Sequence, residues 1–359
     1  MDLLEKARQT INEVDEEMAR LFVRRMEATA EVAEYKQAHG LPIYDPTREE
    51  QVIRQGAGRV EDDTFRAYYV NFIRHNMELS KAYQSALMEG MRVAYCGTEG
   101  AFAHIATGKL FPTAQKLAFG DFTTAYRAVE AGACDAAVLP VENSYNGEVG
   151  QVTDLMFSGS LYVNAVLDLA VSHDLLATKG TKKEDIKTVI SHPQALGQCA
   201  EYIRAQGWST EEYTNTALAA KLVAEKGDHT IAAIASAEAA EVFDLAVLER
   251  NINASRSNTT RFAVFSRAED LRKGPKEHFI LVFTVKNEAG ALARAIDVIG
   301  QHGFNMRNLR SRPMKELLWQ YYFYVEADGN IHSEQGESMM RELSEFCDRL
   351  KIVGTYTQP

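Results

Sequence analysis

The chain has 359 residues, of which 46% are hydrophobic and 25% are charged, and its formal net charge is −11. That length predicts two or three domains, and the ordinary content of 8 prolines and 23 glycines excludes a disordered, collagen-like or fibrous chain. The excess of acidic residues argues against nucleic acid or an anionic membrane surface as a partner. No stretch approaches the roughly 18 uncharged apolar residues of a membrane span.

Four cysteines lie far apart in the sequence without a C-x-x-C pair: Cys96, Cys134, Cys199 and Cys347. This spacing favours reduced thiols over a disulfide framework or a zinc site. The first 21 residues alternate charged and apolar side chains, whereas a signal peptide has a continuous apolar core. We therefore expect a cytoplasmic protein without a bound metal.

Residues 1–90 have the pattern of an all-helical domain. No Pro or Gly occurs over residues 2–39, and their apolar side chains recur at alternating three- and four-residue intervals, as in a coiled-coil or bundle seam. A helix of that length, about 57 Å, cannot bury such a seam alone. We therefore expect a homodimer or a higher homo-oligomer. Asp45 before Pro46 predicts a second helix over residues 46–55, and a third is expected over residues 63–88.

Arg25 occupies a seam position where the alternation requires an apolar residue. A buried guanidinium needs a partner, and a nearby glutamate that fixes the register of the helices would be sufficient. Three polar residues share one face of the third predicted helix at four-residue spacing: Asn76, Ser80 and Gln84. With Arg8 and Lys36 beside the seam, these residues predict a small pocket for a ligand that carries carboxylates.

Residues 1–90 resemble the all-helical class of chorismate mutase, which folds as three helices in an intertwined dimer. The active-site pattern of that family is matched at Arg8, Arg25, Lys36, Asp45, Arg48, Glu49, Ser80 and Gln84. The resemblance implies rearrangement of chorismate to prephenate, a unimolecular reaction that depends on holding a compact conformer and stabilising charge on the ether oxygen.

The same resemblance assigns roles to these residues. Arg8, contributed by the partner chain, and Arg25 would bind the carboxylates of the substrate. Lys36 and Gln84 would point at the ether oxygen. Glu49 and the Asp45 region would hold the ring hydroxyl. Arg48 and Ser80 would support the substrate.

Residues 91–270 alternate strand-like and helix-like segments, which is typical of an α/β domain, and their length is sufficient for two lobes around a cleft. Apolar strands are expected at residues 91–96, 136–142, 161–171, 187–192, 230–235 and 261–266. Gly97 and Gly100 follow the first strand and could form an anion-binding turn or an ordinary tight turn; their G-x-x-G spacing is not a dinucleotide fingerprint. Three further motifs, at residues 140–144, 191–194 and 259–262, also stand at strand ends, where the ligand sites of α/β folds gather.

Together these motifs resemble prephenate dehydratase, whose two-lobed fold is like that of type II periplasmic binding proteins. The family motifs stand here as PVENSYNG, SHPQALGQ and Thr-Arg-Phe. The first glycine turn departs from the family because Ala101 and Ala103 replace hydroxyl-bearing residues, so that helix is a weaker candidate for direct substrate contacts. The candidate site residues are Glu142, Asn143, Ser144, Ser191, His192, Gln198, Thr260, Arg261 and Phe262.

The reaction that this resemblance implies is the decarboxylating dehydration of prephenate to phenylpyruvate. It needs a proton donor at the departing hydroxyl and groups that bind the carboxylates. Thr260 is the candidate beside the hydroxyl, and Arg261 is the candidate for a carboxylate. His192 would be either an acid or the cap of the following helix.

Residues 277–359 predict the order strand, helix, strand, strand, helix, strand, which is a ferredoxin-like βαββαβ plait. The elements are expected at residues 278–285, 291–303, 304–313, 319–327, 334–350 and 351–357, after a linker over residues 272–276. This plait resembles an ACT domain, with the effector motifs at Gly290, Ala291 and Leu292 and at Ser311, Arg312 and Pro313. The resemblance implies L-phenylalanine as an effector, although Arg310 replaces the glutamate of the second motif. A plait that only dimerises, without a ligand, is the alternative.

The whole chain thus resembles a bifunctional chorismate mutase–prephenate dehydratase with an ACT domain, acting on chorismate and prephenate without a cofactor. The domains would be residues 1–90, 91–270 and 277–359. The alternative from another class is a regulatory or solute-binding protein that binds a carboxylate ligand without turning it over.

Overall fold

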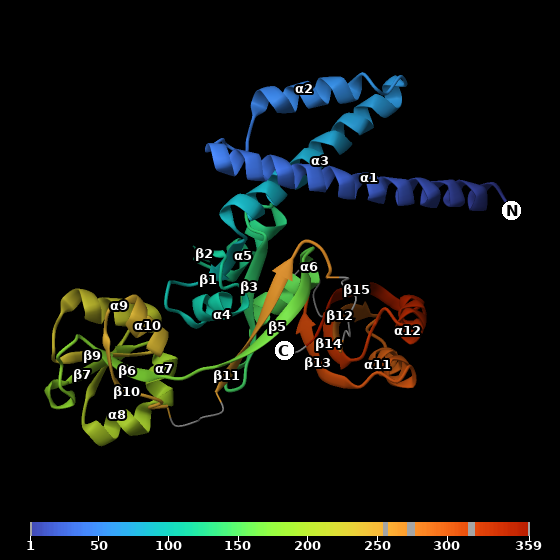
Figure 1. The fold of residues 1–359 in the computed structure, drawn as a ribbon. Helices are drawn as coiled ribbons and strands as arrows, with labels where there is room; N and C mark the ends of the chain where they lie inside the picture. Colours follow the sequence, from blue (N-terminus) through green and yellow to red (C-terminus); the bar gives the residue numbers. More distant parts are fainter. Residues whose placement is uncertain (1, 254–257, 271–276, 315–319, 358–359) are drawn as a thin grey trace. The chain divides into compact units, whose positions relative to one another are not determined.

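The computed structural model describes residues 2–253, 258–270, 277–314 and 320–357. The chain divides into two compact units, Met1–Met91 and Arg92–Pro359 (Figure 1). The linker expected at residues 272–276 lies outside the described residues. Over the part of the chain that is described, no helix combines the length and the apolar character needed to cross a membrane.

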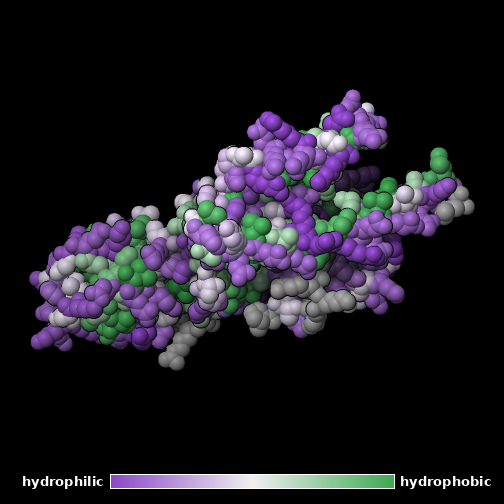
Figure 2. Space-filling model, turned by 45° about the horizontal axis from the view of Figure 1, so that its top comes forward, coloured by the Kyte–Doolittle hydropathy of each residue, from purple (hydrophilic) through white to green (hydrophobic). Residues whose placement is uncertain are grey.

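The first unit consists of three helices, as predicted: α1 (Leu3–His39), α2 (Pro46–Ala57) and α3 (Asp63–Glu89). Asp2 and Glu5 form a capping box at the start of α1, and Gly40 ends the helix in the left-handed conformation. Helix α3 packs against both α1 and α2. The seam residues in the N-terminal part of α1 are exposed, including Ile11 at 58% and Leu21 at 62%. Figure 2 shows apolar side chains at the surface along this part of the helix.

The second unit contains two sheets. The larger has the strand order β13-β14-β12-β15-β5-β11-β3-β1-β2, with β4 paired to β3. Its first-lobe strands are β1 (Arg92–Cys96), β2 (Gln115–Phe119), β3 (Ala136–Asn143), β4 (Gly147–Glu148), β5 (Tyr162–Ala170) and β11 (Thr259–Ser266). The helices of this lobe are α4 (Phe102–Leu110), α5 (Phe122–Glu130) and α6 (Gly150–Ser158). Tyr126, Met156 and Phe265 belong to the core between the sheet and helices α5 and α6.

The smaller sheet forms a second lobe and has the order β10-β6-β9-β7-β8. Its strands are β6 (Asp174–Ala177), β7 (Thr188–Ser191), β8 (Ser209–Glu212), β9 (Ile231–Ala235) and β10 (Ala246–Glu249). The helices are η1 (Lys183–Asp185), α7 (Pro193–Gln198), α8 (Ala200–Gln206), α9 (Thr216–Lys226) and α10 (Ala237–Val242). The chain enters this lobe after β5 and returns to the larger sheet at β11, so the two lobes are joined by two connections.

The last part of the chain has the predicted order: β12 (His278–Val285), α11 (Ala291–Gln301), β13 (Met306–Pro313), β14 (Tyr321–Asp328), α12 (Glu334–Ser344) and β15 (Cys347–Tyr356). The predicted end of the second helix was wrong, because α12 stops at Ser344 and β15 already begins at Cys347. Leu350 has helical spacing in the sequence, but the structure packs it from the strand against the core of the plait. Cys347 pairs with Val285 of β12 and so starts the strand early.

One contact makes the sheet of the plait continuous with that of the first lobe. Strands β15 and β5 run parallel and meet at Gly354 and Val163. A Cβ atom on residue 354 would lie 2.0 Å from the Val163 carbonyl oxygen, so the approach requires glycine. The plait is therefore built into the second unit through main-chain pairing.

Candidate active sites

A cavity of about 320 Å³ lies between the three helices of the first unit. Its lining contains all but one of the residues predicted for this site: Arg25, Lys36, Asp45, Arg48, Glu49, Ser80 and Gln84. The exception is Arg8, which is exposed and stands 17 residues before Arg25 on the same helix. That separation is roughly 25 Å along the axis. Within one chain, the structure therefore does not bring Arg8 to the cavity.

Arg25 is held in this cavity by neutral acceptors. Its guanidinium donates to the hydroxyl of Ser80 and, at 3.2 Å, to the Asn76 carbonyl oxygen. Among the described residues it has no carboxylate partner in an ion pair, so the structure does not show a glutamate fixing the register. Burial lowers the pKa of Arg25, but guanidinium stays protonated in proteins. The site thus presents a positive charge that no anion of the described chain neutralises.

Lys36 and Gln84 also contribute polar groups to the lining of this cavity. The Lys36 ammonium donates to the Ile43 carbonyl oxygen at 2.6 Å. The Oε1 atom of Gln84 is buried and has no hydrogen-bond partner among the described residues. Lys81, which the sequence analysis missed, also lines the cavity and forms an ion pair with Glu49 at 2.9 Å.

Asp45 has a structural contact of its own at the entrance to α2. Its carboxylate accepts a hydrogen bond from the Arg48 backbone N–H at 3.0 Å and caps the helix. The Arg48 side chain donates to Gln51 at 2.8 Å. Both residues line the cavity, so either side chain reaches a ligand only by giving up or sharing these contacts.

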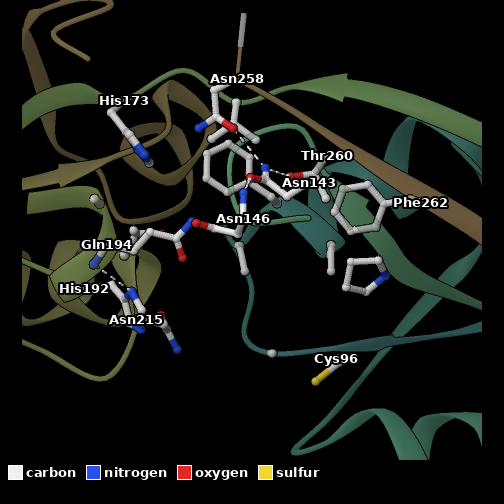
Figure 3. Close-up of a pocket in the computed structure, with 18 of the residues that line it drawn as sticks. Cys96, Asn143, Asn146, His173, His192, Gln194, Asn215, Asn258, Thr260 and Phe262 are labelled. Carbon is white, nitrogen blue, oxygen red and sulfur yellow. Dashed lines mark hydrogen bonds between the residues drawn. The ribbon is translucent and has the colours of Figure 1, made fainter. Parts of the chain in front are cut away.

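A second cavity, of about 400 Å³, lies between the two lobes of the second unit (Figure 3). The predicted residues that line it are Asn143, His192, Gln198, Thr260 and Phe262. Helices α4 and α9 also reach it with their first residues, which direct positive dipole ends toward an anion. The lining contains Cys96 as well, but burial raises the pKa of that thiol to about 11, which argues against a nucleophilic cysteine.

The four other predicted residues do not line this cavity. Ser191 is buried and donates to the Ile234 carbonyl oxygen, and the Ser144 hydroxyl accepts from the Thr259 backbone N–H at 2.9 Å. Glu142 and Arg261 are neighbours of Asn143 and Thr260 on β3 and β11. Because successive side chains of a strand point to opposite faces, these two charged residues face away from the cavity.

Arg261 instead forms ion pairs on the other face of the sheet. Its guanidinium lies 2.9 Å from the Asp168 carboxylate and 3.3 Å from that of Glu326. The hydrogen bond to Asp168 holds the pKa of Arg261 above its usual value. The structure therefore contradicts the prediction that Arg261 binds a substrate carboxylate in the cleft. The described lining of the cavity contains no Lys or Arg.

Thr260 is oriented by Asn143. The Oδ1 atom of Asn143 accepts from the backbone N–H groups of Tyr145 and Asn146, both at 3.0 Å. Its Nδ2 must therefore donate, and it does so to Thr260 Oγ1 at 2.9 Å. With that lone pair used, the Thr260 hydroxyl can direct its own proton into the cavity.

His192 caps helix α7, and its ring nitrogen Nδ1 accepts from the Gln194 backbone N–H at 3.3 Å. Of the two roles that the sequence left open, acid or helix cap, the structure shows the cap. The ring also lines the cavity (Figure 3).

Comparison with known proteins follows the same division of the chain. Residues 7–85 match the family model of chorismate mutase type II, and residues 93–270 match that of prephenate dehydratase. The bifunctional chorismate mutase/prephenate dehydratase of Enterobacter agglomerans is 31% identical over 97% of this chain and 94% of its own. This chain belongs to the bifunctional chorismate mutase/prephenate dehydratase family. The resemblance of residues 1–90 to chorismate mutase and of residues 91–270 to prephenate dehydratase is thereby confirmed.

Two solved structures resemble this chain over about three quarters of its length. A prephenate dehydratase from Arthrobacter aurescens, in complex with L-Phe, is 25% identical with a TM-score of 0.69 and covers 74% of this chain and 90% of that one. GqqA, described as a novel type of quorum quenching acylase, is 30% identical with a TM-score of 0.70 and covers 75% of this chain and 98% of that one.

The residues predicted to bind an effector lie in two places on this chain. Gly290 caps helix α11 with a φ of 85°, and Ala291 and Leu292 follow in its first turn. Ser311, Arg312 and Pro313 lie on β13, at the edge of the sheet. Arg312 contacts Asp154 at 2.8 Å. Pro313 lines a cavity of about 470 Å³ beside α6, to which Gly290 and its neighbours do not contribute.

The sequence analysis missed two buried polar residues of the dehydratase cavity, His173 and Asn258. Asn258 directly precedes the last strand-end motif and would have been included by extending that motif. His173 precedes β6, a strand that the sequence analysis did not predict, so no strand-end argument applied to it.

Proposed function

We propose that this chain rearranges chorismate to prephenate in the helical cavity and converts prephenate to phenylpyruvate in the cavity between the lobes. Both steps serve L-phenylalanine biosynthesis. The observation that carries the proposal is the pair of separate cavities, each lined by its own predicted polar set within the segment that matches the corresponding family.

The mutase reaction needs no nucleophile, and the helical cavity offers positioning groups. Arg25 carries an unneutralised charge for one carboxylate of the substrate, and Lys36 and Gln84 are available for the ether oxygen, where negative charge develops. Their stabilisation is larger in the transition state than in the ground state, and this difference accelerates the reaction.

The mutase site is completed in a homodimer. Arg8 cannot reach the cavity of its own chain, and the seam around it is exposed. Pairing the N-terminal parts of α1 from two chains would bury the seam and bring Arg8 to the partner's cavity.

In the dehydratase reaction the bond to the ring carboxylate breaks and releases carbon dioxide. Its electron pair enters the ring, which becomes aromatic as the bond to the hydroxyl oxygen breaks. Thr260 donates a hydrogen bond to that oxygen as it leaves, and one proton taken up from the solvent completes the water molecule. Because the described lining holds no Lys or Arg, amide groups and the ends of α4 and α9 bind the carboxylates.

We further propose that residues 277–359 form an ACT domain that binds L-phenylalanine, and that the two lobes are related to type II periplasmic binding proteins. The βαββαβ order and the two effector motifs support the first point, as does the L-Phe complex of the Arthrobacter aurescens relative. The thiols of the described cysteines are unpaired, which supports a reducing, cytoplasmic location.

The test is to incubate the purified full-length chain with chorismate and follow prephenate and phenylpyruvate. Formation of phenylpyruvate is the expected result. Accumulation of prephenate would refute the dehydratase activity alone. Binding of prephenate or chorismate without any product would support the solute-binding alternative and refute both activities.

A further inference from the structure

A series of hydrogen-bonded side chains, buried or half-buried, leads from Thr260 along the dehydratase cavity to His173. Asn143 Nδ2 lies 2.9 Å from Asn258 Oδ1, and Asn258 Nδ2 lies 3.0 Å from Gln198 Oε1. The same Gln198 oxygen lies 2.8 Å from His173 Nε2. His173 and Asn258 are 3% and 5% exposed, so water does not compete strongly for these bonds.

The orientation of every group in this hydrogen-bonded series follows from Asn143, whose amide is fixed by backbone contacts. Two backbone N–H groups require Asn143 to present its oxygen to them, so its Nδ2 donates to Asn258. Asn258 must then accept with Oδ1 and donate with Nδ2, which makes the Gln198 oxygen the acceptor. His173 can contact that oxygen only as a donor, through a protonated Nε2.

Two atoms at the His173 end of this hydrogen-bonded series have no partner among the described residues. They are the Nε2 of Gln198 and the Nδ1 of His173, and both are buried. Burial lowers the pKa of His173, although Gln198 and Asp174 act in the opposite direction, so the ring is neutral with a free lone pair on Nδ1. The amide of Gln198 is then held through its oxygen alone, because its buried N–H₂ group donates to nothing among the described residues.

We propose that His173 is a positioning residue of the dehydratase site, whose Nε2–H fixes the amide of Gln198 and so keeps this side chain in place in the cavity lining for substrate binding. This inference rests on the proposed dehydratase function. His173 acts through Gln198 and does not transfer a proton. Without it, one of the two donors that fix the Gln198 oxygen is lost, and the side chain is less firmly held in the cavity lining.

The experiment is a double-mutant cycle on the full-length chain, with steady-state kinetics on supplied prephenate. His173→Leu replaces the donor by an apolar side chain. It is expected to raise KM for prephenate about tenfold, which corresponds to the loss of one ordinary hydrogen bond, with a smaller effect on kcat. His173→Gln retains an N–H at similar reach and is expected to restore KM to within about threefold of the original chain. In the Gln198→Leu background, His173→Leu is expected to cause no further change.

The matched control is His229→Leu, which removes an imidazole hydrogen bond to Thr181, 2.7 Å long, outside the cavity. Mutase activity and the melting temperature of each variant report on folding. An unchanged KM in His173→Leu would overturn the proposal. So would effects that multiply in the double variant, or a His173→Gln variant that is folded yet as impaired as His173→Leu. If the unmutated chain makes prephenate but no phenylpyruvate, the proposed dehydratase function fails, and this role fails with it.

Discussion

At the scale of single residues, Arg25 and Thr260 show how each cavity keeps one group available for a substrate. The guanidinium of Arg25 is held by a hydroxyl and a carbonyl, so its charge is not neutralised. The hydroxyl of Thr260 accepts from Asn143 and therefore has its proton free to donate. The sequence predicted both residues from their positions, but only the hydrogen-bond partners show which way each one acts.

Arg25→Ala is expected to reduce the mutase rate by more than about 100-fold, because it removes the charge that binds a carboxylate in the transition state. Dehydratase activity on supplied prephenate is expected to remain, since the second cavity belongs to a different compact unit. Assays with each substrate separately will measure this, and an equal loss of both activities would contradict two separate sites.

Thr260→Val keeps the shape of the side chain and removes the hydroxyl. We expect at least about a 100-fold loss of kcat on prephenate, with unchanged mutase activity, because no donor remains at the leaving oxygen. Thr260→Ser, the control, keeps the hydroxyl and should stay within about tenfold of the original rate. Full activity of the valine variant would exclude Thr260 as the donor.

At the scale of secondary-structure elements, side chains along strands β3 and β11 alternate between the two faces of the sheet, so one set faces the cavity and the other faces the plait. Asn143 and Thr260 face the cavity, while Glu142 and Arg261 face the plait. Arg310 on β13, which replaces the glutamate of the family motif, forms an ion pair with Glu142 at 2.6 Å. The plait thereby holds the back of the two strands that carry the dehydratase residues.

Arg310→Glu is expected to lower the free energy of unfolding by about 1–3 kcal/mol, because it places two partly buried carboxylates together. Denaturant unfolding will measure the loss. The matched variant, Arg310→Glu with Glu142→Arg, reverses the pair and should recover most of the stability. Equal losses in both variants would show that the ion pair does not matter.

The sequence predicted most elements but missed β2, β4, β6, β8 and β10, and for β2 and β8 the physical reason is plain. Both lie at the edges of their sheets, and the exposed residues of β2 and of Ser209–Glu212 in β8 do not form an apolar run. Strand alternation alone could have separated Glu142 from Asn143. The irregular register between Arg261 and Phe262, and the pairing of Arg261 with Glu326, depend on contacts across distant segments and could not be read from spacing.

At the scale of the whole molecule, the continuous sheet is what makes the plait and the first lobe one unit. Side-chain ion pairs assist this contact, but the main chains of β15 and β5 approach closely at Gly354. The domain boundary predicted near residue 277 marks a change of pattern in the sequence, while the structure continues the sheet across it.

Gly354→Ala is expected to lower the melting temperature by several degrees, since its Cβ would lie 2.0 Å from the Val163 carbonyl oxygen and β15 must move away. Gly120→Ala is the control, because a Cβ there meets nothing within 4 Å. Calorimetry on both variants compares them directly, and equal melting temperatures would mean that the two strands do not need this approach.

The absence of Lys and Arg from the described lining of the dehydratase cavity also determines how the two activities respond to ionic strength. Salt screens the attraction between a substrate dianion and the arginine and lysine side chains of the mutase cavity, whereas bonds from amide groups are nearly indifferent to it. Raising the concentration of an inert salt should therefore increase KM for chorismate and leave KM for prephenate almost unchanged. A single polypeptide would then contain one salt-sensitive and one salt-tolerant step, and the amount of prephenate released between them would depend on the surrounding electrolyte.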